Sequence, residues 1–204
     1  MKKRYVACLL AVVVLSPAPL AIQMTDIDQL ARCGWERARA AAKEGGAAES
    51  LAPARECLAK LERWAADSTW RWHVEYARSL IAAAIAAAQD ERQEMELHLV
   101  HARSLVERLR DVMEVDRWRP LAIDEAEGEL WFEVDDYERA EAAYQRATAA
   151  NASQSVWLGL ARSAARLQHT ALACKGYREW VLSFPGDFYS HEAREYITAH
   201  CNPD

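Results

Sequence analysis

Glycine and proline are scarce in this chain, with seven and six copies among 204 residues. The glycines form no G-x-G-x-x-G or G-x-x-x-x-G-K-[ST] loop, which argues against the common phosphate-binding loops. The five cysteines include no C-x-x-C pair, so a thioredoxin-like redox motif and a four-cysteine zinc site are disfavoured. G-x-S-x-G and S-x-x-K are missing as well. We therefore expect no enzyme and no cofactor.

Good helix formers make up most of what is present, and about half of the residues are apolar. The few glycines, prolines and polar caps divide the chain into nine helical stretches joined by short links. We predict an all-α fold in which consecutive helices are antiparallel neighbours. The expected helices lie at about 25–43, 50–66, 68–89, 90–115, 121–134, 136–150, 155–167, 171–183 and 188–201.

The first 21 residues are typical of a secretory signal peptide. Three basic residues at positions 2–4 precede an apolar core at 6–15, and small residues with prolines follow. We expect a periplasmic or secreted protein with no membrane span in the mature chain. Proline stands close to both candidate cleavage positions, after Ala18 and after Ala21. An uncleaved N-terminal membrane anchor is therefore the alternative.

Net charge bears on the kind of partner. The formal charge is −6, and loss of the leader with its three cations would make it −9. An acidic protein is a poor candidate for contacts with a phosphate backbone, so we expect no nucleic-acid partner.

Four cysteines remain after the leader, and an oxidising compartment favours pairing them as disulfides. Four cysteines allow three connectivities. Cys33 and Cys57 flank the Gly45-Gly46 turn, and Cys174 and Cys201 flank the last predicted turn in the same way. We predict the pairs Cys33–Cys57 and Cys174–Cys201, with free thiols as the alternative.

The most specific pattern lies in residues 121–187, where small and aromatic residues recur at matched spacing. The second copy contains Trp157, Leu160, Ala161, Ala164, Ala173, Tyr177, Trp180 and Pro185. The first copy contains Gly128, Trp131, Ala140, Tyr144 and Ala147. This arrangement resembles the tetratricopeptide repeat, whose pattern is W-x2-L-G-x2-Y, then A-x3-F-x2-A, then P. The first copy departs from it, since Asp124 replaces the tryptophan and Glu127 the leucine.

The resemblance implies a short solenoid of stacked antiparallel hairpins. The corresponding division is a signal peptide at 1–21, an N-terminal hairpin at 22–66 and a degenerate repeat-like hairpin at 67–120. Two clearer repeats at 121–187 and a C-terminal capping helix at 188–204 follow. The recurring aromatic residues are expected to fill the core between crossing helices.

Such arrays bind proteins or peptides along a groove lined by the first helix of each pair. If the resemblance holds, the groove residues are Glu125, Glu129, Phe132, Glu133, Leu158, Arg162 and Arg166. The charged members are expected either to contact a partner or to pair with one another across neighbouring helices.

We therefore expect an exported helical-repeat scaffold that binds a protein or peptide of the cell envelope. The alternative is an assembly subunit of a larger envelope complex with no peptide groove in use. A minor alternative is a metal-dependent enzyme, because Glu94, His98 and His101 share one helix face. The signature H-E-x-x-H is absent, so we expect no metal site.

Overall fold

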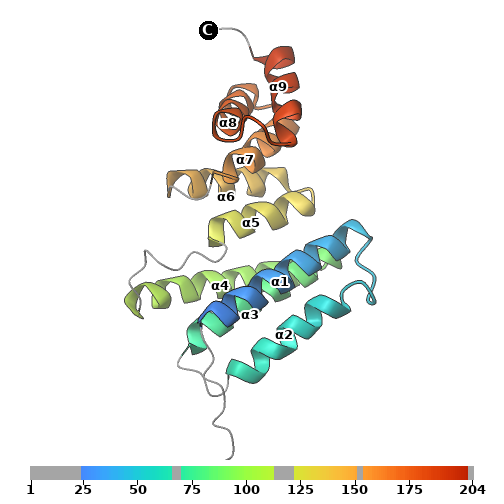
Figure 1. Cartoon of the computed structure of the whole chain (residues 1–204), viewed down its shortest axis with the longest axis vertical. Helices are drawn as coiled ribbons and strands as arrows, with labels where there is room; N and C mark the ends of the chain where they lie inside the picture. Colours follow the sequence, from blue (N-terminus) through green and yellow to red (C-terminus); the bar gives the residue numbers. More distant parts are fainter. Residues whose placement is uncertain (1–23, 66–69, 113–121, 151–153, 202–204) are drawn as a thin grey trace, which may run out of the picture.

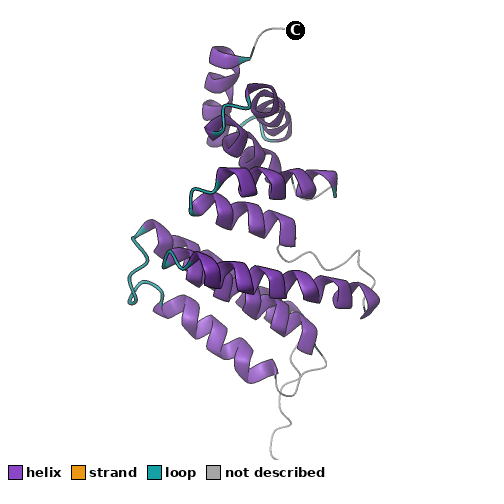
Figure 2. Cartoon of the chain, turned by 180° about the vertical axis from the view of Figure 1, so that it is seen from behind, coloured by secondary structure: helices purple, strands orange, loops and turns teal. Residues whose placement is uncertain are grey.

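The computed structural model describes residues 24–65, 70–112, 122–150 and 154–201. These residues form helices and loops without any strand (Figure 2), so the prediction of an all-α fold is confirmed. The nine helices in the described ranges are α1 (Met24–Lys43), α2 (Ala52–Ala65), α3 (Arg71–Ala88), α4 (Arg92–Val112), α5 (Ile123–Glu133), α6 (Tyr137–Ala149), α7 (Val156–Arg166), α8 (Thr170–Ser183) and α9 (Tyr189–His200).

The helices follow one another along the long axis of the molecule. α1 to α4 gather at one end, α5 and α6 lie in the middle, and α7 to α9 form the other end (Figure 1). Each helix packs against the next helix in the sequence. In addition, α3 packs against α1, α5 against α3, and α7 against α5. α3, α5 and α7 therefore each contact both helices of the pair before them.

α3 lies at the centre of the larger end and packs against α1, α2, α4 and α5. Its second half is buried almost all round, including Ala83, Ala84, Ala86 and Ala87. Small side chains allow four helices to approach the same segment closely. The alanine run thus acts as packing surface, as its composition predicts.

Tyr144 fills the space between three consecutive helices. Its ring lies against Gly128 of α5 and Gly159 of α7, so a Cβ added at either glycine would come within 2.7 Å and 2.2 Å of ring atoms. Tyr144 is 5% exposed, and Trp131 and Tyr177 are also buried. Trp157 is only partly buried, with Lys175 Nζ 5.5 Å from its ring centroid. The prediction that these aromatics fill the core is correct except for Trp157, whose ring borders solvent.

Four of the described helices, α1, α3, α5 and α7, end in the same turn. One residue adopts a left-handed conformation, with φ of 88°, 58°, 60° and 62° at Gly45, Asp90, Asp135 and Gln168. The next residue donates its N–H to the carbonyl five positions earlier, as in a Schellman motif. These four bonds join Gly46 to Ala41, Glu91 to Ala86, Asp136 to Trp131 and His169 to Ala164, at 2.8–2.9 Å. The turn repeats although only one of the four left-handed residues is glycine.

This turn corrects one expected helix start. Asp90 and Gln93 have the spacing of a capping box, which would place Asp90 at the N-cap of the fourth helix. In the structure α4 begins at Arg92, and Asp90 is the left-handed residue that ends α3. The backbone demand of the preceding helix end outweighs the capping tendency of the side chain.

Gln168→Gly is expected to raise the free energy of unfolding by about 0.5–1 kcal/mol. Glycine adopts a positive φ without the steric cost that Gln168 bears at 62°. Gly45→Ala should lower stability by about 1 kcal/mol for the same reason, although nothing lies within 4 Å of the added Cβ. Urea unfolding measures both, and Gln168→Ala is the control, since it keeps the Cβ. Equal stability of Gln168→Gly and Gln168→Ala would contradict the expectation.

The cysteines lie in two pairs, at the two ends of the stack. Cys174 of α8 and Cys201 after α9 form a disulfide with a Cα–Cα distance of 5.7 Å, which confirms this predicted pairing. The two cysteines are 27 positions apart in the sequence. A disulfide that closes such a loop raises the free energy of unfolding by roughly 3–4 kcal/mol in the chain-entropy model. Cys33 of α1 and Cys57 of α2 are free, with Sγ atoms 3.5 Å apart. Their disulfide stays a prediction.

Candidate binding surface

Two of the three expected groove acids on α5, Glu129 and Glu133, are engaged by an arginine from α1. Arg39 Nη1 donates to Glu129 Oε2 and Arg39 Nε donates to Glu133 Oε1, both at 2.6 Å. Helices α1 and α5 do not pack against each other, but each packs against α3. The arginine therefore spans from one helix to the other over their common neighbour. We call Arg39, Glu129 and Glu133 the Arg39 cluster.

Burial controls the electrostatics of the Arg39 cluster. The Glu129 and Glu133 side chains are 22% and 19% exposed, and Glu133 Oε2 is buried with no hydrogen-bond partner in the described part of the chain. Burial raises the pKa of Glu129 to about 7, assisted by the charges of Glu125 and Glu133 and opposed by Arg39. Burial also raises the pKa of Glu133, again opposed by Arg39. In both cases Arg39 favours the ionised carboxylate against the effect of burial.

Stability should consequently fall as Glu129 ionises. Its pKa is about 7 in the folded protein against an ordinary value of 4.5, so between these pH values the folded state binds more protons than the unfolded state. The contribution of Glu129 is present below pH 4.5 and is lost as pH rises to about 7, by at most about 3 kcal/mol. Glu129→Gln lacks this titration. The free energy of unfolding, measured from pH 5 to 8 for the wild type and for Glu129→Gln, tests this expectation. The same pH dependence in both proteins would contradict the raised pKa of Glu129.

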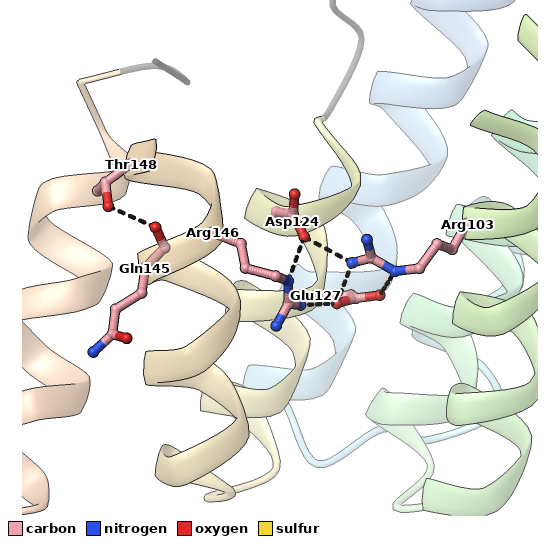
Figure 3. A network of polar contacts seen from close by, with 6 residues as sticks. All are labelled: Arg103, Asp124, Glu127, Gln145, Arg146 and Thr148. Carbon is pink, nitrogen blue, oxygen red and sulfur yellow. Dashed lines mark hydrogen bonds and ion pairs between the residues drawn. The ribbon is translucent and has the colours of Figure 1, made fainter. Parts of the chain in front are cut away.

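A second polar network joins α4, α5 and α6 (Figure 3). Arg103 of α4 and Arg146 of α6 approach the same two acids of α5 from opposite sides. Arg103 lies 2.7 Å from Asp124 and 2.6 Å from Glu127, and Arg146 Nε lies 2.8 Å from Asp124. Arg146 also pairs with Glu127, which is 9% exposed. The two acids are thus held between two arginines.

The same network explains two departures from the repeat pattern. Asp124 and Glu127 occupy positions equivalent to Trp157 and Leu160, where the pattern has apolar side chains. Burial tends to raise the pKa of Asp124, but hydrogen bonds from Arg103 and Arg146 hold it below its usual value. The buried acids are therefore compensated by charge pairs, and the network belongs to the packing between helices.

The expected groove residues on α7 have separate surroundings. Arg162 Nε donates to Glu192 Oε1 of α9 at 2.9 Å, and its guanidinium lies 4.6 Å from the ring centroid of Tyr189. Tyr177 also donates to Glu192 Oε1, at 3.1 Å. Hydrogen bonds from Arg162 lower the pKa of Glu192, against the effect of burial. Arg162 thus ties α7 to the last helix.

Leu158 lies in the hydrophobic core of α7 to α9 and is 7% exposed. Its assignment to an open binding surface is corrected, because a side chain packed between helices offers a partner almost no area. Glu125 accepts a hydrogen bond from the Ser155 hydroxyl at 2.6 Å. Its carboxylate is therefore engaged within the protein as well.

Two expected groove residues meet a tyrosine that the sequence did not single out. The Phe132 and Tyr137 rings are 5.3 Å apart, edge to face, and the Arg166 guanidinium lies 5.2 Å from the Tyr137 centroid. Arg166 is exposed, and both rings are partly exposed. We call Phe132, Tyr137 and Arg166 the aromatic patch. It brings together side chains from α5, α6 and α7.

The structure joins the expected acids and arginines to partners that sequence spacing did not identify. Glu129 and Glu133 pair with Arg39, which is 90 and 94 residues away, rather than with Arg162 or Arg166. No periodicity within α1 marks Arg39 as different from the other arginines of that helix. Among the contact residues that the sequence analysis missed, Tyr137 carried a local signal. It is the first residue of α6 and follows the acidic pair that separates two predicted helices.

The minor metal hypothesis finds little geometric support. His98 Nε2 lies 3.5 Å from Glu94 Oε1, and His101 is exposed on the same helix. Among the described residues, no three His, Cys, Asp or Glu side chains are grouped so that they could hold a metal ion. Glu94 and His98 form a surface pair.

The helices in the described ranges include none that is both long and apolar enough to span a membrane. Comparison with protein-family models, curated proteins and solved structures finds no match to this chain.

Proposed function

We propose that this chain is an exported helical-repeat scaffold that binds a protein or peptide of the cell envelope. The observation that carries the proposal is the recurrence of one packing unit. Each of α3, α5 and α7 contacts both helices of the preceding pair, and α1, α3, α5 and α7 end in the same turn. Such contacts support a stack of helical hairpins, and tetratricopeptide-like solenoids, which the sequence pattern resembles, present an extended surface to their partners.

Export rests on the composition of residues 1–21, which lie outside the described residues. A basic start, a short apolar core and small residues are the features of a secretory leader. The disulfide between Cys174 and Cys201 supports the same conclusion, since such bonds persist in oxidising compartments. The proposed location is the periplasm or the medium, with an N-terminally anchored form as the alternative.

The aromatic patch is the proposed contact surface. Most charges of the expected groove are paired within the protein: Glu129 and Glu133 of α5 with Arg39 of α1, and Arg162 of α7 with Glu192 of α9. The exposed guanidinium of Arg166 instead stacks on a ring, and its N–H groups can still reach a partner's carboxylate or carbonyl oxygens. Arginine and aromatic side chains are also the residues most often found at the energetic centre of interfaces.

Capture from an envelope extract tests this surface. Purified wild-type protein, Phe132→Ala and Arg166→Ala would be immobilised, and the bound proteins would be quantified for each. Arg63→Ala is the matched control, because Arg63 is an exposed arginine on α2, at the other end of the stack. Proteins retained by the wild type and the control but lost from both patch variants would support the proposal. Equal retention by all four would favour the alternative of an assembly subunit that uses another surface.

Arg162→Ala and Arg166→Ala are expected to separate stability from binding. Arg162→Ala should lower the free energy of unfolding by about 1 kcal/mol, because it removes a two-point pair with Glu192. Arg166→Ala should change it by less than about 0.5 kcal/mol, as for most exposed positions. Thermal unfolding measures both, and loss of partner capture is expected only for Arg166→Ala. The reverse pattern would place recognition on Arg162.

A further inference from the structure

The two free cysteines of the first hairpin differ in accessibility. Cys33 and Cys57 come from α1 and α2, which pack against each other, and their Sγ atoms are 3.5 Å apart. Cys57 is 2% exposed, whereas Cys33 is partly exposed. Cys33 is therefore the more accessible of the two residues to an external molecule.

The surroundings of Cys57 also favour a later reaction of this thiol than of Cys33. Burial raises the pKa of the Cys57 thiol, with a further contribution from its hydrogen bond to Cys33. Arg37 Nη1 lies 3.8 Å from Cys57 Sγ, where it can donate a hydrogen bond to a developing thiolate. The thiolate is the reacting form of cysteine, so Cys57 is poorly suited to react first and suited to react second, with its neighbour.

We propose that Cys33 and Cys57 form a thiol–disulfide exchange site for small disulfides of the glutathione type. Cys33 reacts first with the external disulfide, and Cys57 then closes the bond between the two helices. This inference is independent of the proposed binding function, because it concerns the α1–α2 hairpin and not the aromatic patch.

The two steps balance as ordinary exchange. Cys33 loses its proton to solvent and attacks one sulfur of the external disulfide, whose S–S bond breaks and releases one thiol. A mixed disulfide on Cys33 remains. Cys57 then loses its proton, and its sulfur attacks Cys33 Sγ and displaces the second thiol. Two protein thiols are oxidised by two electrons, and one external disulfide is reduced to two thiols.

The test uses the full chain with Cys8→Ser, which removes the thiol of the leader. This protein and its Cys33→Ser and Cys57→Ser variants would be reduced under native conditions, freed of reductant and exposed to oxidised glutathione. Acid-quenched samples are then mapped by mass spectrometry, and peptides with Cys174 and Cys201 are followed separately. Circular dichroism establishes that each variant is folded.

The parent protein is expected to form the Cys33–Cys57 bond without a lasting glutathione adduct. Cys57→Ser should retain glutathione on Cys33, because the group that releases it is missing. Cys33→Ser should react at Cys57 at least about tenfold more slowly than Cys57→Ser reacts at Cys33. Oxidation should raise the urea midpoint of the parent by more than that of either variant, because the Cys174–Cys201 bond can re-form in all three proteins and the Cys33–Cys57 bond only in the parent. Two unreacted thiols in the parent, or equal rates in the two variants, would overturn the proposal.

Discussion

Arg39→Ala is expected to lower the free energy of unfolding by about 3–5 kcal/mol. The arginine lies 2.6 Å from each of two carboxylates that are about four-fifths buried. Its removal leaves Glu129 and Glu133 without their cation, next to Glu125, whose charge already raises the pKa of Glu129. Breaking a buried pair on one side is costly because the remaining charge is poorly hydrated and has lost its partner. Urea unfolding at pH 8, above the pKa of about 7 of Glu129 in the wild type, measures the loss.

Protonation and neutral substitution should both reduce this loss. At pH 5 the carboxyl groups of Arg39→Ala take up protons, so the difference from the wild type should shrink. Adding Glu129→Gln and Glu133→Gln should recover most of the stability at pH 8. Arg32→Ala is the control, since Arg32 is an exposed arginine on the same helix. An Arg39→Ala effect no larger than that of Arg32→Ala would mean that the Arg39 cluster does not join α1 to α5.

Tyr144→Ala is expected to cost about 3–5 kcal/mol, as for other large aromatic residues in a core. The ring is 5% exposed and fills the space that Gly128 and Gly159 leave between α5, α6 and α7. Truncation leaves a cavity that the backbones of three helices can close only in part. Chemical unfolding followed by circular dichroism measures the loss.

Gly159→Ala gives the complementary test. Its added methyl group would lie 2.2 Å from Tyr144 Cζ, so in the wild type it should cost about 1–3 kcal/mol by overpacking. In the Tyr144→Ala background the same methyl enters the cavity and should be neutral or stabilising. Gly186→Ala is the control, because nothing lies within 4 Å of its added Cβ. Additive effects of the two substitutions would contradict the contact between this ring and α7.

Helix positions could be predicted from the sequence because their signals are local. Helix-forming composition, short polar links and the Gly45-Gly46 pair each act over a few residues, and the nine helices found in the described residues lie close to the expected ranges. The Cys174–Cys201 pairing was predictable on similar grounds, since antiparallel helices joined by a short turn bring level positions together. Burial of Tyr144 and Tyr177 followed from their spacing relative to small residues.

The turns show where local signals fail. The left-handed residue Gly45 is predictable because glycine favours this conformation. Asp90, Asp135 and Gln168 adopt the same conformation although they are not glycines. Asp90 had a competing role as a helix cap. The packing of each odd-numbered helix against the next helix requires the chain to reverse at these points, and this requirement outweighs the steric cost at a single residue.

The candidate surface depended on contacts between distant segments. Repeat spacing placed Glu129, Glu133, Arg162 and Arg166 on helices of one series, but it could not say which charges would remain exposed. That outcome was decided by Arg39 and Glu192, which come from helices outside the matched copies. Long side chains pair with whatever opposite charge the tertiary fold brings within about 4 Å, and sequence spacing does not encode that distance.

The sequence by itself determined the helical class, the approximate positions of the helices and most of the buried residues, because propensity and apolar spacing act within a single helix. Only the tertiary structure decided that acids at two apolar positions of the pattern are held between Arg103 and Arg146 (Figure 3). It also decided that Arg166 lies over the ring of Tyr137 and stays exposed, whereas Arg162 pairs with Glu192. Partner choice among charged groups is a property of the packed helices, since it depends on which side chains burial brings together.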